Sequence, residues 1–150
     1  MSEVFFYHLQ QSALEQVLPD LLERTLQRGW RAVVQAGSAE RVEQLNAMLW
    51  TYSRDGFLPH GSKADGAAGD QPVWLTDQAE NPNGAQVLFL VDGAAGEAFD
   101  GYERICDIFD GNDTDAVADA RERWKRAKAS GHSLAYWQQE DGRWSKKATG

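Results

Sequence analysis

Apolar residues along the chain follow two periods, and segments of the two kinds alternate. Short apolar or alternating runs, which are typical of β-strands, occur at residues 4–10, 30–36, 72–76, 85–91, 103–109 and 133–138. Apolar residues three or four positions apart, which predict helices, occur over residues 14–26, 42–49 and about 114–130. Strands that alternate with helices predict an α/β protein built on one sheet.

Residues that favour helix ends support these boundaries. Ser12 is a plausible N-cap of the first helix, and Gly29 is a plausible residue just beyond its end. Pro19 falls inside the first apolar stripe, so either the helix bends there or its regular part begins there. We favour a bend, because the stripe continues on both sides. Ser38 and the Asp113-Thr114 pair are expected to cap the other two helices.

The remaining segments differ in what they predict. The continuous apolar run Val87–Val91 indicates a strand buried on both faces, hence a central one. Residues 50–60 are expected to form a loop or a short irregular strand, and the glycine-rich residues 61–70 a mobile loop. The polar tail from about residue 140 is expected to fray. No linker divides the chain, so residues 1–150 are expected to form a single domain.

Composition narrows the functional class. Hydrophobic residues make up 42% of the chain, which allows a proper core, and no apolar run is long enough to span a membrane. The N-terminus does not resemble a signal peptide, and Cys106 is the only cysteine, so a reducing cytoplasm is the expected compartment. The net charge of −8 disfavours binding to nucleic acid or to anionic membranes.

A search for catalytic chemistry finds nothing above background. The single glycine of the Gly37-Ser38 turn is far short of a phosphate-binding loop. The histidines are scattered without metal-ligand spacing, and Cys106 lies in an apolar strand where a buried, inert thiol is favoured. Asp107 and Asp110 could bind a cation, but a solvated loop is the favoured interpretation. We therefore expect no metal, no cofactor and no enzymatic activity.

The third helix carries an unusual charge pattern for an acidic chain. Residues 121–128 contain five basic residues and one acidic residue. Arg121, Lys125 and Lys128 share one face, and Trp124 lies beside them. A basic rim next to an aromatic ring suits an acidic peptide with a free carboxylate, because arginine can bind that group with two hydrogen bonds. The alternative is an ordinary amphipathic helix with a solvated basic face, and the pattern alone slightly favours it.

A second feature is a group of large apolar residues in or beside the loop after the second helix. Such residues are either buried in the core or presented to a partner, and the sequence does not separate the two. The group consists of Trp50, Tyr52, Phe57, Leu58 and Pro59.

The chain resembles a known family over most of its length, including these two regions. The stretches FYHL at residues 6–9, SRDGFLPH at residues 53–60 and ARERWK at residues 120–125, in this order and spacing, resemble the chi subunit of the bacterial DNA polymerase III holoenzyme. The resemblance implies a Rossmann-like mixed β-sheet of about seven strands, flanked by three helices and without a nucleotide-binding loop. It also implies a non-catalytic replication adaptor of the clamp-loader assembly.

The resemblance further implies two partners and their sites. One partner is the acidic C-terminal tail of single-stranded DNA-binding protein, and the other is a psi subunit; a helicase at the same surface is left open. The chain departs from some members of this family just before Arg121. Those members carry a lysine about one helical turn earlier, and residues 116–118 of this chain contain no lysine. The residues implied for the tail are Arg121, Trp124, Lys125 and Lys128, and those implied for the psi-type interface are Trp50, Phe57 and Pro59.

Two other functional classes remain to be weighed. A degenerate Rossmann-like nucleotide-binding protein or enzyme is the alternative hypothesis, and the absent glycine fingerprint counts against it. Direct binding of single-stranded DNA through the basic helix is disfavoured by the net charge.

Overall fold

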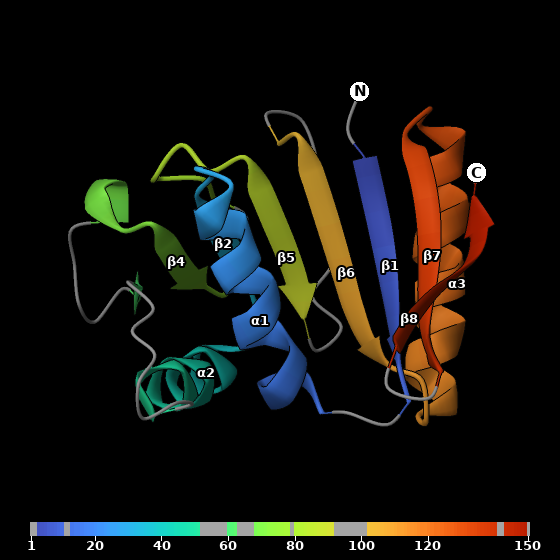
Figure 1. Cartoon of the computed structure of the whole chain (residues 1–150), viewed down its shortest axis with the longest axis horizontal. Helices are drawn as coiled ribbons and strands as arrows, with labels where there is room; N and C mark the ends of the chain where they lie inside the picture. The colour runs from blue at the N-terminus through green and yellow to red at the C-terminus, as the bar shows by residue number, and fades with distance from the viewer. Residues whose placement is uncertain are drawn as a thin grey trace.

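The computed structural model describes residues 3–10, 13–51, 60–62, 68–78, 80–91, 102–140 and 143–149. Within these residues the chain forms one eight-stranded sheet with the spatial order β3-β4-β2-β5-β6-β1-β7-β8 (Figure 1). In that order the strands are Gly61–Ser62, Val73–Thr76, Ala32–Gln35, Val87–Val91, Arg104–Asp110, Glu3–Leu9, Ser133–Glu140 and Arg143–Thr149.

The sheet is mixed. All neighbouring strands pair in parallel except β7 and β8, which are antiparallel. Parallel pairing requires crossover connections, and helices supply several of them. The helices are α1 Leu14–Gln27, α2 Ala39–Thr51 and α3 Thr114–Ala129, with a short 3₁₀ turn η1 at Ala68–Asp70. The predicted α/β class with a mixed sheet and three helices is confirmed; the sheet has eight strands where about seven were predicted.

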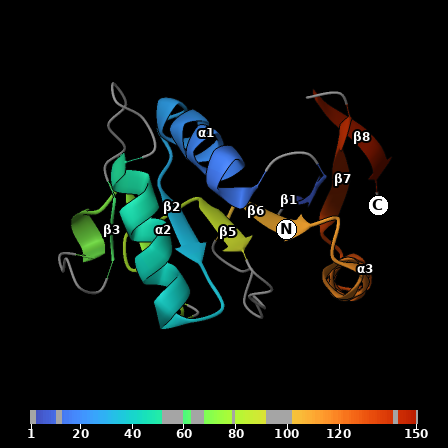
Figure 2. The same ribbon diagram turned by 90° about the horizontal axis from the view of Figure 1, so that it is seen from below.

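The helices divide between the two faces of the sheet. Helix α1 lies on one face and α3 on the other, as Figure 2 shows, and α2 packs its apolar residues into the same cluster as α1. Successive residues of a strand point to opposite faces, so Phe6 of β1 packs in the apolar cluster under α3, whereas Tyr7 packs against the cluster under α1 and α2. Strand β5 lies between β2 and β6 with all five residues buried, as the run Val87–Val91 predicted.

The helix ends largely follow the predicted signals. Gly29 has φ +84° just after α1, a left-handed conformation that glycine adopts at no steric cost. Ser38 Oγ accepts a hydrogen bond from the Arg41 amide at 3.2 Å, and Asp113 caps α3 by accepting from the amides of Asp115 and Ala116. Pro19 lies inside α1, so the helix does not begin there.

The N-cap prediction for α1 was wrong. The N-cap is Ala13, whose side chain has no acceptor, and Ser12 lies outside the described residues. The Gln16 side chain satisfies a different group at this helix end, because its Oε1 accepts a hydrogen bond from the Ala13 amide at 3.1 Å. None of the helices in the described ranges is long and apolar enough to cross a lipid bilayer.

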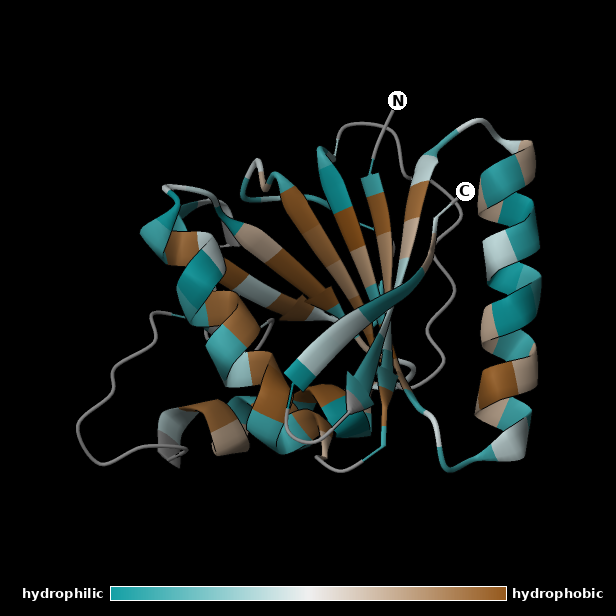
Figure 3. Ribbon diagram, turned by 45° about the vertical axis from the view of Figure 1, so that its right-hand side comes forward, coloured by the Kyte–Doolittle hydropathy of each residue, from teal (hydrophilic) through white to brown (hydrophobic). Residues whose placement is uncertain are grey.

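Residues beyond 140 were expected to fray, and this expectation was wrong for residues 143–149. They form β8, which extends the edge of the sheet and curves across it in Figure 3. Trp144 anchors the strand by packing edge-on against Tyr7, with 5.1 Å between ring centroids. The polar character of this strand reflects its position, since charged side chains such as Lys146 are common on exposed edge strands.

At the other edge of the sheet, Gly61–Ser62 form β3 within the stretch predicted as a mobile loop.

Candidate functional site

Helix α3 is attached to the sheet by a buried ion pair. The Arg123 guanidinium donates two hydrogen bonds to the Asp107 carboxylate of β6, from Nε to Oδ2 and from Nη2 to Oδ1, the latter at 3.0 Å. The two side chains are only 12% and 4% exposed. The expectation that Asp107 lies in a solvated loop was therefore wrong, and Arg123 is not part of the exposed basic surface.

Trp124 is a second attachment of α3. Its ring is half-buried and lies edge-on against Phe6 and Tyr136, at centroid distances of 5.4 and 6.0 Å. The buried Ala120 and Ala127, one turn to either side, have small side chains that let the helix approach the sheet closely. Trp124 thus serves the core first, and only its outer part is available to a partner.

Three basic residues form one exposed flank of α3, next to the buried face. Arg121, Lys125 and Lys128 occur at i, i+4 and i+7, so at 100° per residue they lie within a narrow arc beside Trp124. We call these three residues the basic flank. Lys125 Nζ lies 3.3 Å from Glu122 Oε1, but both side chains are more than half exposed, so this pair contributes little and leaves the lysine available.

A histidine and a tyrosine border this flank on the sheet side. His8 Nδ1 lies 2.5 Å from the Tyr136 hydroxyl, and the charge of Arg121 acts on both groups. Burial lowers the pKa of His8, so the ring stays neutral and the arginine is the cation at this end of the flank. Its Nε2 is enclosed beside Gly111 and has no hydrogen-bond partner among the described residues.

Gly111 is required by this arrangement, because a Cβ there would lie 1.9 Å from His8 Cδ2. The sequence did not identify His8 or Tyr136 as part of the site. Both are ordinary strand residues in the sequence, and only the register of β1 with β6 and β7 brings them under α3. The sole sequence signal was the position of His8 within the FYHL stretch.

The second candidate surface is represented by Trp50. Its side chain is 52% exposed, the large hydrophobic residue that stands out on the described surface. It lies near the end of α2 rather than in a loop, and its ring centroid is 4.5 Å from that of His60. Phe57 and Pro59 lie outside the described residues. Leaving about half of a tryptophan side chain in contact with water is energetically unfavourable. Trp50 is therefore suited to a surface that a partner covers.

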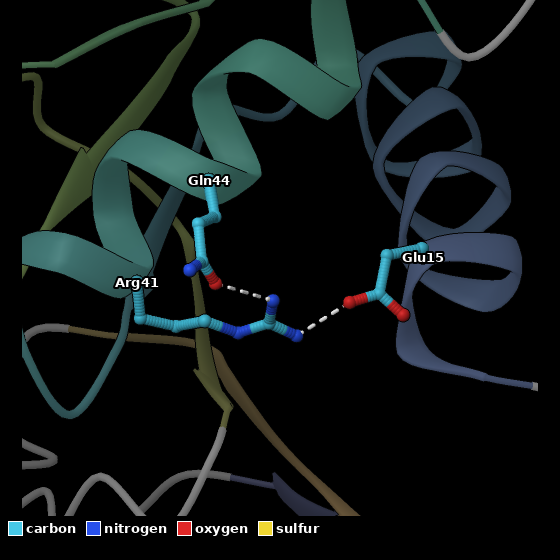
Figure 4. A network of polar contacts seen from close by, with 3 residues as sticks. All are labelled: Glu15, Arg41 and Gln44. Carbon is cyan, nitrogen blue, oxygen red and sulfur yellow. Dashed lines mark hydrogen bonds and ion pairs between the residues drawn. The ribbon is translucent and has the colours of Figure 1, made fainter.

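A Rossmann-type nucleotide site would lie at the turn before α2. Here the arginine beside this turn instead connects α2 to α1. Figure 4 shows Arg41 pointing from α2 toward α1, where its Nη2 donates to Glu15 Oε1 at 2.6 Å. Its Nη1 donates to Gln44 Oε1 at 3.2 Å. This contact lowers the pKa of Glu15, which remains a carboxylate beside the turn. An anion bound at this turn would be repelled by the Glu15 carboxylate, and Arg41 is already paired with that carboxylate. This arrangement agrees with the missing phosphate loop.

Potential catalytic groups are also sparse. The Cys106 thiol is buried, as predicted, and burial raises its pKa to about 12, so little thiolate forms near neutral pH. No cluster of three or more metal-ligating side chains occurs in the part of the chain that the structure describes. The features that stand out among the described residues are therefore the basic flank and the exposed Trp50.

The family model described as DNA polymerase III chi subunit, HolC, matches residues 1–135. The chain belongs to this family of DNA polymerase III chi subunits. A curated relative from Rickettsia prowazekii, described as a probable DNA polymerase III subunit chi, is 35% identical over 91 residues. The alignment covers 61% of this chain and 55% of the relative, so it spans a little over half of that protein.

Proposed function

We propose that the protein is a non-catalytic adaptor of the clamp-loader assembly and acts in the cytoplasm at the replisome. In this proposal α3 binds the acidic C-terminal tail of single-stranded DNA-binding protein. The observation that carries the proposal is the basic flank, an exposed cationic surface beside a half-buried tryptophan in a chain of net charge −8. Three positive charges grouped on one helix flank favour an acidic peptide, while the net negative charge of the protein repels the DNA backbone.

Each residue of the flank has a distinct role in this proposal. Arg121 binds the terminal carboxylate of the tail, because a guanidinium can donate two parallel hydrogen bonds to it. The exposed part of Trp124 contacts the apolar side chain at the tail end. Lys125 and Lys128 attract the acidic residues before it as point charges. The His8–Tyr136 pair lies beside Arg121 and is neutral, so Arg121 remains the cation that binds the peptide's carboxylate.

Binding of the tail is expected to require its last residue and to weaken with salt. A labelled peptide from the C-terminus of the host's single-stranded DNA-binding protein would be titrated by fluorescence anisotropy, beside a peptide lacking the last residue. Between low and high salt we expect affinity to fall by about tenfold, because exposed charges are screened. Equal affinity for both peptides, or binding independent of salt, would contradict the proposed site.

We also propose that Trp50, Phe57 and Pro59 contribute to an interface with a psi-type subunit. Support comes from the exposure of Trp50, which is unfavourable in an isolated protein. This surface is separate from α3, since Trp50 lies near the end of α2, which packs in a different apolar cluster from α3. The two partners can therefore bind at the same time, as an adaptor requires. A helicase competing for the Trp50 surface is compatible with the same chemistry.

Replacing Trp50 by serine is expected to abolish co-purification with a psi-type subunit, because a buried tryptophan is the commonest kind of interface hot spot. The variant should fold normally, since it removes an exposed ring. Tail-peptide affinity should be unchanged in the same variant and serves as the control. If the psi-type subunit is retained in full, the interface lies elsewhere.

A further inference from the structure

A cavity of about 250 Å³ lies on the face of the sheet opposite to α3, between the last turns of α1 and the strands β5, β6 and β1. Its lining combines cationic, aromatic and small polar side chains. The lining residues are Tyr7, Leu21, Arg24, Thr25, Arg28, Trp30, Val87, Phe89, Arg104 and Cys106. The proposed partner sites use none of them.

The charge of this cavity contrasts with that of the protein. Three of the ten lining residues are arginines and none is acidic, although the chain has a net charge of −8. Arg28 and Arg104 both lie over the ring of Trp30, with their guanidinium carbons 4.1 and 5.5 Å from its centroid. Two like charges are thus held near one aromatic ring at the mouth of a single cavity.

The α1 helix dipole explains only part of this arrangement. Arg24 and Arg28 lie at the C-terminal end of α1, where the dipole favours cations. Arg104 comes from β6, so the dipole does not account for its convergence on the same cavity.

The three arginines differ in how fully they are paired. Arg104 donates to Glu3 at 3.0 Å, and Arg24 lies 3.2 Å from Asp20 in an exposed pair. Within the described ranges, Arg28 makes a ring contact and no carboxylate pairs with it. Its guanidinium therefore has hydrogen-bond donors available for an anion that enters the cavity.

The walls and floor suit a ligand with a planar apolar part. Trp30, Val87 and Phe89 provide apolar and aromatic surface. Tyr7 and Cys106 are neutral, because burial raises the pKa of both and that of Cys106 to about 12. A neutral hydroxyl or thiol can donate a hydrogen bond to an anion, whereas an ionised one would repel it.

We propose that this cavity binds a nucleoside monophosphate, with the phosphate held by the arginines and the base against the apolar lining residues. A phosphate monoester carries nearly two negative charges at neutral pH and matches several guanidinium groups better than a single carboxylate does. The volume is slightly below that of typical cofactor pockets, which limits the ligand to about one nucleotide. The cavity lies toward the amino ends of β5 and β6, away from the Gly37-Ser38 turn.

The test uses adenosine 5′-monophosphate as the probe and isothermal titration calorimetry at low ionic strength. We expect binding that Arg28→Gln weakens by about tenfold or more, because it removes a charge-assisted contact and leaves a polar, uncharged side chain. Amide resonances near Arg28, Trp30 and Arg104 should shift during the titration. Arg28 is exposed, and among the described residues its side chain contacts the Trp30 ring without an ion pair, so this variant should fold.

The matched control is Arg126→Gln, which removes the same charge from an exposed position on α3. It should leave nucleotide affinity unchanged. Absence of binding, equal losses in the two variants, or equal affinity for adenosine and its monophosphate would overturn the proposal. Because the cavity and the basic flank lie on opposite faces, failure here leaves tail binding unaffected, and the reverse also holds.

The same titration distinguishes two sources of the nucleotide. An oligothymidylate with a 5′-phosphate is compared with one that lacks it. A preference for the phosphorylated strand that Arg28→Gln removes would identify DNA ends as the ligand. Binding of the free monophosphate without that preference would identify a free nucleotide.

Discussion

Replacing Arg121 by alanine is expected to weaken binding of the tail peptide by about 10- to 100-fold. A hydrogen-bonded contact to a charged group contributes about 1.5–3 kcal/mol, and the proposed contact to the terminal carboxylate would be of this kind. Arg121 is exposed, and no hydrogen bond within the described structure depends on it. The loss should therefore appear in affinity and not in stability. Fluorescence anisotropy with the labelled peptide, together with a thermal melt, measures both.

Two matched variants make this experiment specific. Arg126→Ala removes the same charge from the same helix, but Arg126 lies about 140° around the axis from Arg121; its effect should be small. Arg121→Lys keeps the charge and loses the planar two-donor geometry, so it should recover only part of the affinity. If Arg126→Ala weakens binding as much as Arg121→Ala, the helix acts through total charge alone and the proposed carboxylate site is wrong.

The largest effect on stability is expected at the ion pair beneath the same helix. Replacing Arg123 by methionine should lower the free energy of unfolding by about 3–5 kcal/mol, because it leaves the Asp107 carboxylate buried and unpaired. Since α3 carries the basic flank, tail binding should weaken at temperatures where the helix detaches. Chemical denaturation monitored by circular dichroism gives the free energy.

This loss of stability should depend on pH, with a definite sign. Burial raises the pKa of Asp107, and the Arg123 guanidinium opposes that rise. Without the guanidinium, the folded-state pKa lies well above the unfolded value of about 3.9, so the folded variant takes up a proton. Stability of the variant should then be greatest near pH 4 and fall as the pH increases toward neutrality.

A double variant provides the control for the ion pair. Asp107→Leu combined with Arg123→Met replaces both charges by apolar groups of similar size. Such replacements of a buried pair are often neutral or stabilising, so the double variant should recover most of the lost free energy and lose the pH dependence. If the double variant is as unstable as Arg123→Met alone, the pair is not what attaches α3 to the sheet.

The sequence was a good guide where local chemistry decides the outcome. Helix and strand positions, the Gly29 and Asp113 helix ends, the central place of Val87–Val91 and the burial of Cys106 all follow from periodicity and side-chain type. The basic flank also follows, because residues at i, i+4 and i+7 share a helix face wherever the helix is placed.

The errors arose where distant segments meet. Strand β8 could not be recognised, because a polar edge strand and a polar tail look alike until Trp144 packs on Tyr7. Asp107 looked solvated because its partner Arg123 is 16 residues away, on a different element.

The sequence by itself determined the three helices, most of the strands, the fold class and the charged face of α3, because these depend on neighbours within one or two turns of chain. Only the tertiary structure decided that Arg123 is buried while Arg121 is exposed. It likewise decided that His8 and Tyr136, from two different strands, meet beneath the helix and border its charged face. It also decided that Arg28 and Arg104, 76 residues apart in the chain, converge on one ring. The physical reason is that strand order and register are set by the packing of the whole core, which no local pattern encodes.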